Sequence, residues 1–320
     1  MDEIVRPRAI RLEASSYCQL RCPSCPTTSG AIHPAVGSGF LSLEDFRGLL
    51  DGNPNLRLIE LSNYGEIFLN PQLSDIMRLA GERGVALAAT NGANFNTVSD
   101  AVLEDLVRCR FRHITCSIDG ASAETYARYR VRGDFDRVIA NIRRLNEFKR
   151  ASGSNLPTLD WQFVVFGHNE HEIPEAQRLA AELGMTLRLK LSWDEAFSPV
   201  RDPDRIKRAV GAPAASRSEF RARFGADYMH GLCHQLWDMP QVNFDGKILG
   251  CCRNFWGEFG GNAFTDGLEA SLNSELMNYA RNMVRGLAPP RDDVPCTTCD
   301  IYLTMRESGR WLDRSSVKKA

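Results

Sequence analysis

Short apolar segments alternate with amphipathic ones between residues 8 and 192, and few folds accommodate that order. Six apolar segments have the length and composition of strands: Ala9–Ala14, Arg57–Ser62, Val85–Thr90, His113–Ile118, Leu159–Val165 and Thr186–Leu191. Helical patterns fill the intervals, most clearly Leu73–Arg83 and Phe135–Lys149, and Ser42 with Asp45 forms a variant of the helix-starting capping box. This order predicts β/α units around a parallel sheet.

Three of the predicted strands have one apolar and one polar face, because alternate side chains point to opposite sides. The polar faces carry Glu60 and Ser62, then Thr115, Ser117 and Asp119, then Arg188, Lys190 and Ser192. Strands covered by helices are normally apolar on both faces. The pattern favours a partial (β/α)6 TIM-like barrel of the α/β class, open and lined by polar groups that face a ligand. An incomplete sheet with solvent-facing sides is the alternative.

Short motifs follow the strands, at the end where β/α barrels carry their chemistry. They are SSYCQLRCPSC, NYGE, TNG, SIDG and FGHNE, in chain order. Each motif alone reads as a turn. Their placement at successive strand ends predicts that they form one site.

The first motif places Cys18, Cys22 and Cys25 within eight residues, with no fourth Cys or His nearby. Three thiols cannot all pair among themselves, and a structural zinc site takes four ligands, typically as two separated pairs. Three thiolates suit an iron–sulfur cube in which one iron lacks a protein ligand. That iron is then available to bind another molecule.

Composition narrows the function classes. A formal net charge of −1 and a pI near 6.6 give no electrostatic case for nucleic acid or an anionic membrane as partner. No apolar run approaches the length of a membrane span, and MDEIVRPRAI lacks the apolar core of a signal peptide. The chain is therefore expected to be cytoplasmic, where clustered cysteines bind metal more often than they form disulfides.

With CxxxCxxC and the strand-end motifs, the chain resembles the radical S-adenosylmethionine (SAM) superfamily over essentially its whole length. The resemblance implies that Cys18, Cys22 and Cys25 hold a [4Fe-4S] cluster whose fourth iron is chelated by the amino and carboxylate groups of SAM. It also implies an external one-electron donor, such as a flavodoxin or ferredoxin.

The resemblance assigns further residues to SAM. Tyr64, Gly65 and Glu66 would receive the methionine amino group. Ser117 and Arg130 would bind the carboxylate, which an Arg fork suits because its donors are planar and bidentate. Asn91 and the backbone of residues 165–167, beginning at Val165, would lie near the ribose and adenine. The chain departs from the family's pattern at two places. Ser24 stands where the family often has an aromatic residue, and the glycine pair before Glu66 is reduced to Tyr64-Gly65.

The second half of the chain resembles a SPASM-type extension in its one-cluster form, Twitch. We expect a barrel over 1–196, a bridge over 197–228 with solvent-exposed charges, and this extension over 229–320. VNFDGKILGCC predicts a hairpin around Asp245-Gly246. The resemblance implies one auxiliary [4Fe-4S] cluster, and structural zinc is the alternative. The ligands would be Cys233, Cys251, Cys296 and Cys299.

Three cysteines remain. Cys109 and Cys116 are expected in the core, because a free cysteine packs as a small apolar residue. Cys252 is interpreted as structural, as an alternative ligand to Cys251, or as a hydrogen-atom donor in the active site.

The resemblance implies a 5′-deoxyadenosyl radical that abstracts a hydrogen atom from a substrate carbon. Inward-facing polar residues predict a polar small molecule, and only seventeen residues precede the first cysteine, which leaves little room for a peptide-recognition domain. We expect a carbohydrate or aminocyclitol, epimerised or dehydrogenated at a C–OH carbon. The alternatives are a maturase of a ribosomally made peptide and a non-catalytic iron–sulfur or zinc scaffold. Candidate substrate contacts are Glu60, Asp119, Arg188, Lys190 and Trp193.

Overall fold

The computed structural model describes residues 4–313, and one curved sheet dominates it. The strands are β1 (Ala9–Leu12), β2 (Leu58–Glu60), β3 (Ala86–Ala93), β4 (His113–Ser117), β5 (Thr158–Val165), β6 (Thr186–Leu191), β7 (Gln241–Val242) and β8 (Ile248–Gly250). Their order in the sheet is β6-β5-β4-β3-β2-β1-β7-β8. Strands β1 to β6 pair in parallel with their neighbours, so the six predicted strands and the partial-barrel fold class are confirmed.

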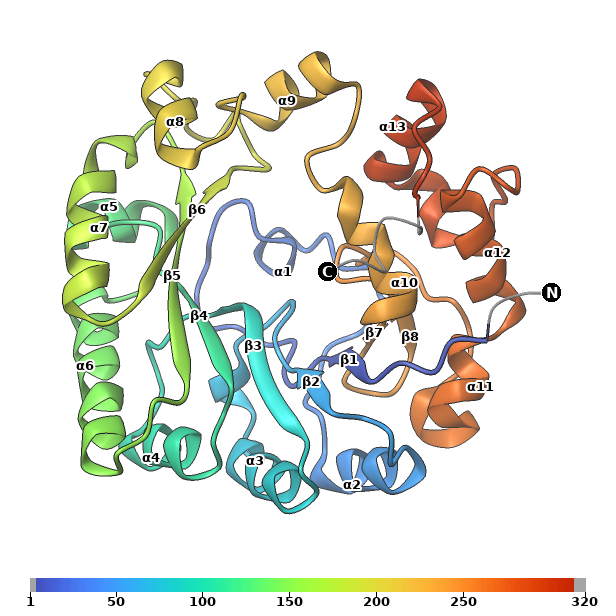
Figure 1. Cartoon of the computed structure of the whole chain (residues 1–320), viewed down its shortest axis with the longest axis horizontal. Helices are drawn as coiled ribbons and strands as arrows, with labels where there is room; N and C mark the ends of the chain where they lie inside the picture. The colour runs from blue at the N-terminus through green and yellow to red at the C-terminus, as the bar shows by residue number, and fades with distance from the viewer. Residues whose placement is uncertain (1–3, 314–320) are drawn as a thin grey trace.

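Helices cover the outer, convex side of this sheet, as Figure 1 shows for α2, α3, α4, α6 and α7. The helices are α1 (Pro26–Ser29), α2 (Leu43–Gly52), α3 (Leu73–Glu82), α4 (Asp100–Arg108), α5 (Ala123–Tyr129), α6 (Phe135–Ala151), α7 (Ile173–Glu182), α8 (Pro203–Val210), α9 (Arg217–Phe224), α10 (Gln235–Asp238), α11 (Leu268–Leu272), α12 (Glu275–Val284) and α13 (Asp300–Ser308). No helix among the described residues is both long enough and apolar enough to span a bilayer.

Local sequence accounts for the ends and the buried faces of these helices. The Ser42 hydroxyl accepts a hydrogen bond from the Asp45 N–H and donates to its carboxylate, which confirms the predicted start of α2. In α6 the buried residues Val138, Ile142 and Leu145 recur on one stripe. Burying each such side chain contributes on the order of 2 kcal/mol, so packing rather than propensity holds the helix on the sheet.

The strand registers place polar side chains in rows on the inner face of the sheet. Ser117 of β4 is in register with Gln162 of β5, which is in register with Arg188 of β6. Arg11 of β1 is likewise in register with Glu60 of β2. The outer face packs the apolar core, which includes Ile10, Ile59, Ile114, Cys116 and Trp161, each 0% exposed. The predicted division into a polar inner face and an apolar outer face is therefore present.

The C-terminal part continues the barrel's sheet. Strand β7 pairs in parallel with β1, and β8 returns antiparallel to β7, so the predicted hairpin is present. Gly246 in its turn has φ +88°, and a Cβ there would lie 2.1 Å from Asn262 Oδ1, so only glycine fits. Strands β7 and β8 thus share a sheet with β1 to β6, and the predicted division into functional domains stays a prediction.

Candidate cofactor and substrate site

The three cysteines of the first motif gather in one place after β1. Cys18, Cys22 and Cys25 pack in a single cluster with Tyr129, Phe166 and neighbouring apolar side chains. Burial, with nearby Glu66 and the other two thiols, raises the pKa of Cys18 to about 12. Burial also raises the pKa of Cys22, and thiols of this kind lose their protons beside a strong positive centre, which a metal cluster supplies. The donor set therefore fits an iron–sulfur cluster.

The spacing of these side chains bears on the kind of metal centre. Within residues 4–313, no three His, Cys, Asp or Glu side chains converge on one ion position. A four-iron cluster does not require the thiolates to converge on one ion, because each thiolate binds a different iron.

The NYGE motif after β2 lies directly against the cysteine loop. The Glu66 N–H donates to the Tyr17 carbonyl at 2.8 Å. A Cβ on Gly65 would lie 2.2 Å from the Ser15 carbonyl oxygen, so any other residue here would push the two loops apart. The structure thus brings predicted residues Gly65 and Glu66 beside the three cysteines, although the two segments are about forty residues apart.

Glu66 is itself buried and satisfied within the chain. Its carboxylate accepts hydrogen bonds from the N–H groups of Asn94 at 2.6 Å and Phe68 at 3.2 Å. Burial raises its pKa to about 7, against the opposing effect of these hydrogen bonds. The Glu66 side chain therefore orders the NYGE loop and is not free to bind a ligand. The backbone of this loop remains available for that purpose.

Glu13 is a site residue that the sequence analysis missed. It is fully buried at the end of β1, where its carboxylate accepts hydrogen bonds from the N–H groups of Tyr64 at 3.1 Å and Gly65 at 3.2 Å. Burial raises its pKa to about 8. The signal was present in the alternation Arg11, Glu13, which puts an acid on the polar face of an otherwise apolar strand.

Arg130 lies beside the cysteine loop and forms a buried ion pair with Asp119. Its guanidinium also approaches the Cys22 sulfur, with 3.6 Å between Nη1 and Sγ. Its Nε is buried without a partner among the described residues. Asp119 is 0% exposed, and its other oxygen accepts the Val164 N–H at 2.6 Å. The structure thus places Arg130 beside the cysteine loop, where Asp119 holds its guanidinium, and its predicted role in binding the SAM carboxylate stays a prediction.

The remaining predicted SAM residues lie on β3, β4 and β5. Ser117 packs on Gly92, where a Cβ would lie 2.2 Å from the Ser117 hydroxyl. The Asn91 side-chain amide donates to Asn63 Oδ1 at 3.0 Å. The Val165 side chain belongs to the apolar core, so a role in binding adenine falls to its backbone.

The candidate substrate residues divide into two groups. Glu60 is buried and accepts hydrogen bonds from Ser62 and Thr90, and Asp119 is paired with Arg130, so both carboxylates are already satisfied. Arg188 is 62% exposed and pairs with Asp160. Lys190 is half-buried and Trp193 is 46% exposed, with its indole N–H on the Ser24 carbonyl at 3.1 Å. Lys190 and Trp193 therefore remain the available contacts.

The four C-terminal cysteines also converge. Cys233 is buried, and its pKa is raised first by burial and then by Cys251, Cys296 and Cys299. Cys296 lies in a short 3-10 turn, Pro295–Thr298, and Cys299 immediately precedes α13. Three separate segments thus bring the four thiols close enough to act on one another electrostatically, and a set of four thiols is the donor type that an iron–sulfur cluster takes.

Cys252 and Tyr64 lie where this second cysteine group meets the barrel. The Tyr64 hydroxyl donates to the Asn254 carbonyl, and the Cys252 N–H donates to Gln235 Oε1 at 2.9 Å. The Cys252 thiol is close enough to raise the pKa of Tyr64 and to oppose the lowering of the Lys190 pKa by burial. The segment that carries Cys252 is therefore held against the NYGE loop of the barrel.

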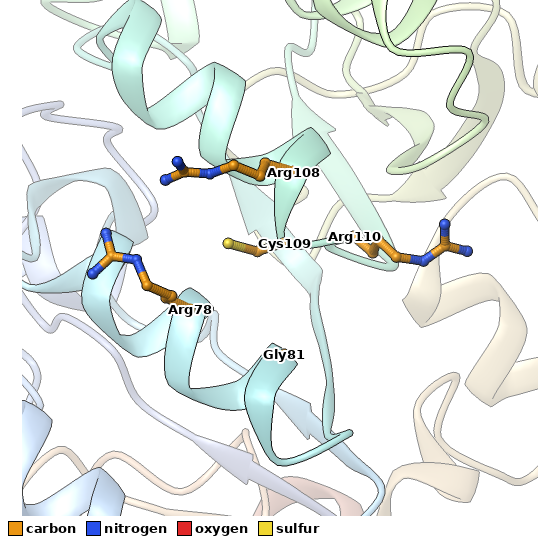
Figure 2. A pocket seen from close by; sticks show the side chains of 5 residues that line it. All are labelled: Arg78, Gly81, Arg108, Cys109 and Arg110. Atoms are coloured by element: carbon orange, nitrogen blue, oxygen red, sulfur yellow. The ribbon is translucent and has the colours of Figure 1, made fainter.

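A pocket of about 390 Å³ lies away from all of these residues (Figure 2). Its lining is Arg78, Gly81, Arg108, Cys109 and Arg110. These residues come from α3, α4 and the turn before β4, at the opposite end of the strands from the motifs. No residue predicted for the site lines this pocket.

Comparison with known proteins identifies the family. The family model described as the Radical SAM superfamily matches residues 12–180, more than half of the 320 residues. The chain therefore belongs to the radical SAM superfamily. Membership implies a [4Fe-4S] cluster and SAM as cofactors, and a reductant that supplies electrons.

Curated relatives match the barrel half of the chain. An AdoMet-dependent heme synthase from Methanosarcina barkeri is 29% identical over 181 residues, 56% of this chain and 48% of the relative. The mycofactocin maturase MftC from Mycobacterium tuberculosis is 23% identical over 185 residues, 57% of this chain and 44% of the relative. The match thus spans about half the length of these relatives.

Solved structures extend the likeness in fold. Streptococcus suis SuiB bound to S-adenosylmethionine superposes with a TM-score of 0.63 at 13% identity, over 92% of this chain and 71% of that chain. BtrN in complex with AdoMet and 2-DOIA has a TM-score of 0.52 at 14% identity, over 94% of both chains. At such identities these similarities show the fold alone.

Proposed function

We propose that Cys18, Cys22 and Cys25 hold the family's [4Fe-4S] cluster and that SAM binds against the NYGE loop. The support is the gathering of the three thiols, the backbone of Gly65 pressed on their loop, and Arg130 beside Cys22. When bound, the cluster and SAM supply a carbon-centred radical that takes a hydrogen atom from the substrate. Ser117 and Arg130 would orient the SAM carboxylate, and Asp119 keeps Arg130 in place.

We propose that Cys233, Cys251, Cys296 and Cys299 hold a second cluster, in a SPASM/Twitch-type extension. Their convergence from three segments and their burial support this assignment. Anaerobically reconstituted protein should then contain about eight irons per chain. About four irons with one zinc would instead make this second site a structural zinc site.

The proposed reaction is epimerisation or dehydrogenation of a polar small molecule, a carbohydrate or aminocyclitol, at a C–OH carbon. The observation that carries it is the hydrogen bond from the Tyr64 hydroxyl to the Asn254 carbonyl, which holds the segment that carries Cys252 against the NYGE loop of the barrel. BtrN, solved with 2-DOIA, aligns with this chain over 94% of both chains, which supports a small substrate.

In the epimerase form, Cys252 would return a hydrogen atom to the opposite face of the substrate radical. The resulting thiyl group is restored by one electron from the external donor and one proton from solvent. In the dehydrogenase form, the substrate radical would lose one proton to solvent and one electron to the second cluster that Cys233, Cys251, Cys296 and Cys299 would hold, which gives a ketone. Both forms need the external donor, a flavodoxin or ferredoxin in our proposal.

The test is 5′-deoxyadenosine formation from SAM by the anaerobic, iron-loaded protein, with a panel of sugars and cyclitols in deuterated water. Deuterium at a C–H of recovered substrate indicates epimerisation, and a ketone indicates dehydrogenation. The C252A variant should still form 5′-deoxyadenosine but yield no deuterated epimer. Deuterated epimer from C252A would contradict the donor role.

Modification of a ribosomally made peptide is the second candidate. SuiB has also been solved bound to precursor peptide SuiA, with a TM-score of 0.61 to this chain, and the relatives include the maturase MftC. A synthetic precursor peptide that raises 5′-deoxyadenosine formation and gains or loses mass would establish this function. Stimulation by a sugar and not by the peptide would exclude it.

A further inference from the structure

Two cations at the carboxyl end of β6 lack a carboxylate partner. The ammonium of Lys190 is half-buried and makes no hydrogen bond or ion pair within residues 4–313. Arg217, the first residue of α9, donates from Nε to the carbonyl of Leu191, next to Lys190, at 3.1 Å. That bond ties α9 to the end of β6, and Arg217 is close enough to Lys190 to lower the pKa of its ammonium.

No acid forms an ion pair with either cation within residues 4–313, although Asp227 opposes the lowering of the Arg217 pKa by burial. Asp119 forms the buried ion pair with Arg130, and Asp300 pairs with Arg253 at 2.9 Å. Burial lowers the pKa of Lys190, and Arg217 lowers it further, against Asp119 and Cys252, which raise it. Two half-buried cations without their own counterion cost free energy, so such an arrangement favours a bound anion.

Two aromatic rings border the same place. The Arg217 guanidinium lies 5.2 Å from the ring centroid of Tyr228 and 6.0 Å from that of Trp193. Trp193 also contacts the cysteine loop through its hydrogen bond to Ser24. A ring substrate could therefore rest on apolar faces while the cations hold its charged group.

The position of Lys190 relates the pair to the chemistry. Lys190 is in register with Val164, whose N–H binds the Asp119 carboxylate beside Arg130 and Cys22. A molecule held at Lys190 thus lies near the strand end that carries Asp119, Arg130 and the first cysteine group.

We propose that Lys190 and Arg217 bind an anionic group of the substrate, a phosphate or a carboxylate. The inference rests on the proposed function and narrows the substrate class to sugar phosphates or sugar acids. It disfavours a cationic aminocyclitol as substrate. It also gives a role to the bridge over 197–228, whose charges were predicted to be a solvated surface. A guanidinium and an ammonium together supply the donors that phosphate and carboxylate oxygens accept.

The test is anaerobic titration calorimetry on the full, iron-loaded chain with saturating SAM, so that the SAM carboxylate is already bound. The probes are glucose 6-phosphate, glucuronate, uncharged glucose, cationic glucosamine and, as a sugar-free anion, inorganic phosphate. At least one anion should bind about tenfold more tightly than glucose, and K190Q and R217Q should each remove most of that preference. Preference for glucose 6-phosphate over glucuronate assigns a phosphate, and the reverse assigns a carboxylate.

R223Q is the matched control, because Arg223 is an exposed arginine of the same helix whose guanidinium donates to the Pro213 carbonyl at 3.0 Å. It should keep the preference. The proposal is overturned if no anion binds more tightly than glucose, or if K190Q and R217Q keep the preference. It is also overturned if these two variants lose affinity for SAM, which would place the cations on the cofactor. Measuring 5′-deoxyadenosine in parallel separates the two proposals, since anion binding without SAM cleavage contradicts only the proposed function.

Discussion

At the scale of single residues, the site depends on buried carboxylates whose hydrogen-bond partners are distant in sequence. Glu13 accepts hydrogen bonds from the N–H groups of Tyr64 and Gly65 in the NYGE loop. Asp119 accepts a hydrogen bond from the Val164 N–H and forms an ion pair with Arg130. Each carboxylate orders a loop rather than facing a ligand. The residues left available at the inner face are therefore few, and Lys190 is one of them.

Replacing Cys18, Cys22 and Cys25 by Ala should abolish 5′-deoxyadenosine formation and remove about four of about eight irons. The second cysteine group lies on other segments, so its iron should remain. Iron analysis and SAM cleavage assays on the same preparation check both statements. SAM cleavage by the triple variant would show that another group binds the catalytic cluster.

Glu13 should make stability depend on pH. Its pKa is about 8 in the folded chain because of burial, against an ordinary value of 4.5. The folded chain then binds more protons than the unfolded chain between these values, so this contribution to the free energy of unfolding decreases as pH rises from 4.5 to about 8. Melting temperatures of the E13Q variant across that range should fall less with pH than those of the wild type.

The matched control for E13Q is E44Q, because Glu44 is an exposed acid in the first turn of α2. Its pH profile should follow that of the wild type. Parallel profiles for E13Q and the wild type would show that Glu13 is charged in both states over this range.

At the scale of elements, the loops at the strand ends are positioned by close backbone approach. The NYGE loop touches the cysteine loop through Gly65, and the TNG segment touches Ser117 through Gly92. These contacts explain why glycine recurs in motifs whose other residues differ.

G65A should disrupt the site, because the added Cβ would lie 2.2 Å from the Ser15 carbonyl oxygen. We expect lower stability and at least tenfold weaker SAM binding, since overpacking of this kind typically costs about 1–3 kcal/mol. Calorimetric unfolding and SAM titration measure the two effects. G48A is the control: Gly48 is exposed in α2 with open space around it, and Ala there should stabilise the helix slightly. Unchanged SAM affinity in G65A would mean that the loop tolerates displacement.

At the scale of the whole molecule, the C-terminal part is an extension of the barrel's sheet. The β7–β8 hairpin pairs with β1, and the Tyr64 hydroxyl bonds to Asn254, 190 residues away in sequence. The two cysteine groups are thus held by one continuous structure. We expect the chain to unfold as one cooperative unit.

Y64F should weaken this junction by about 1 kcal/mol, the net contribution of a hydrogen bond whose acceptor stays buried. Denaturant titration should show a single transition at a lower midpoint, and the iron content should be unchanged. Y17F is the control, because Tyr17 is 45% exposed and its ring packs on Phe40. Two separate transitions in Y64F or in the wild type would contradict the single cooperative unit.

The alternation of strands and helices, the polar inner face and the cysteine motifs could all be read from the chain. They arise from local periodicity and spacing, which act over a few residues: Ser42 starts α2 as predicted, and Ser117 and Lys190 lie on the polar face. The resemblance carried by these motifs led to the correct superfamily.

Only the tertiary structure decided which polar residues are available. Glu60 and Asp119 lie on the predicted polar face, but buried partners occupy their carboxylates. Glu13 holds the NYGE loop, a contact that the local sequence pattern does not predict. Arg217 lies in a segment predicted to be solvated, yet it bonds to the end of β6. Each of these outcomes depends on the curvature of the sheet and on where α9 returns to it. Those are set by many weak contacts between residues far apart in the chain, which no local pattern records.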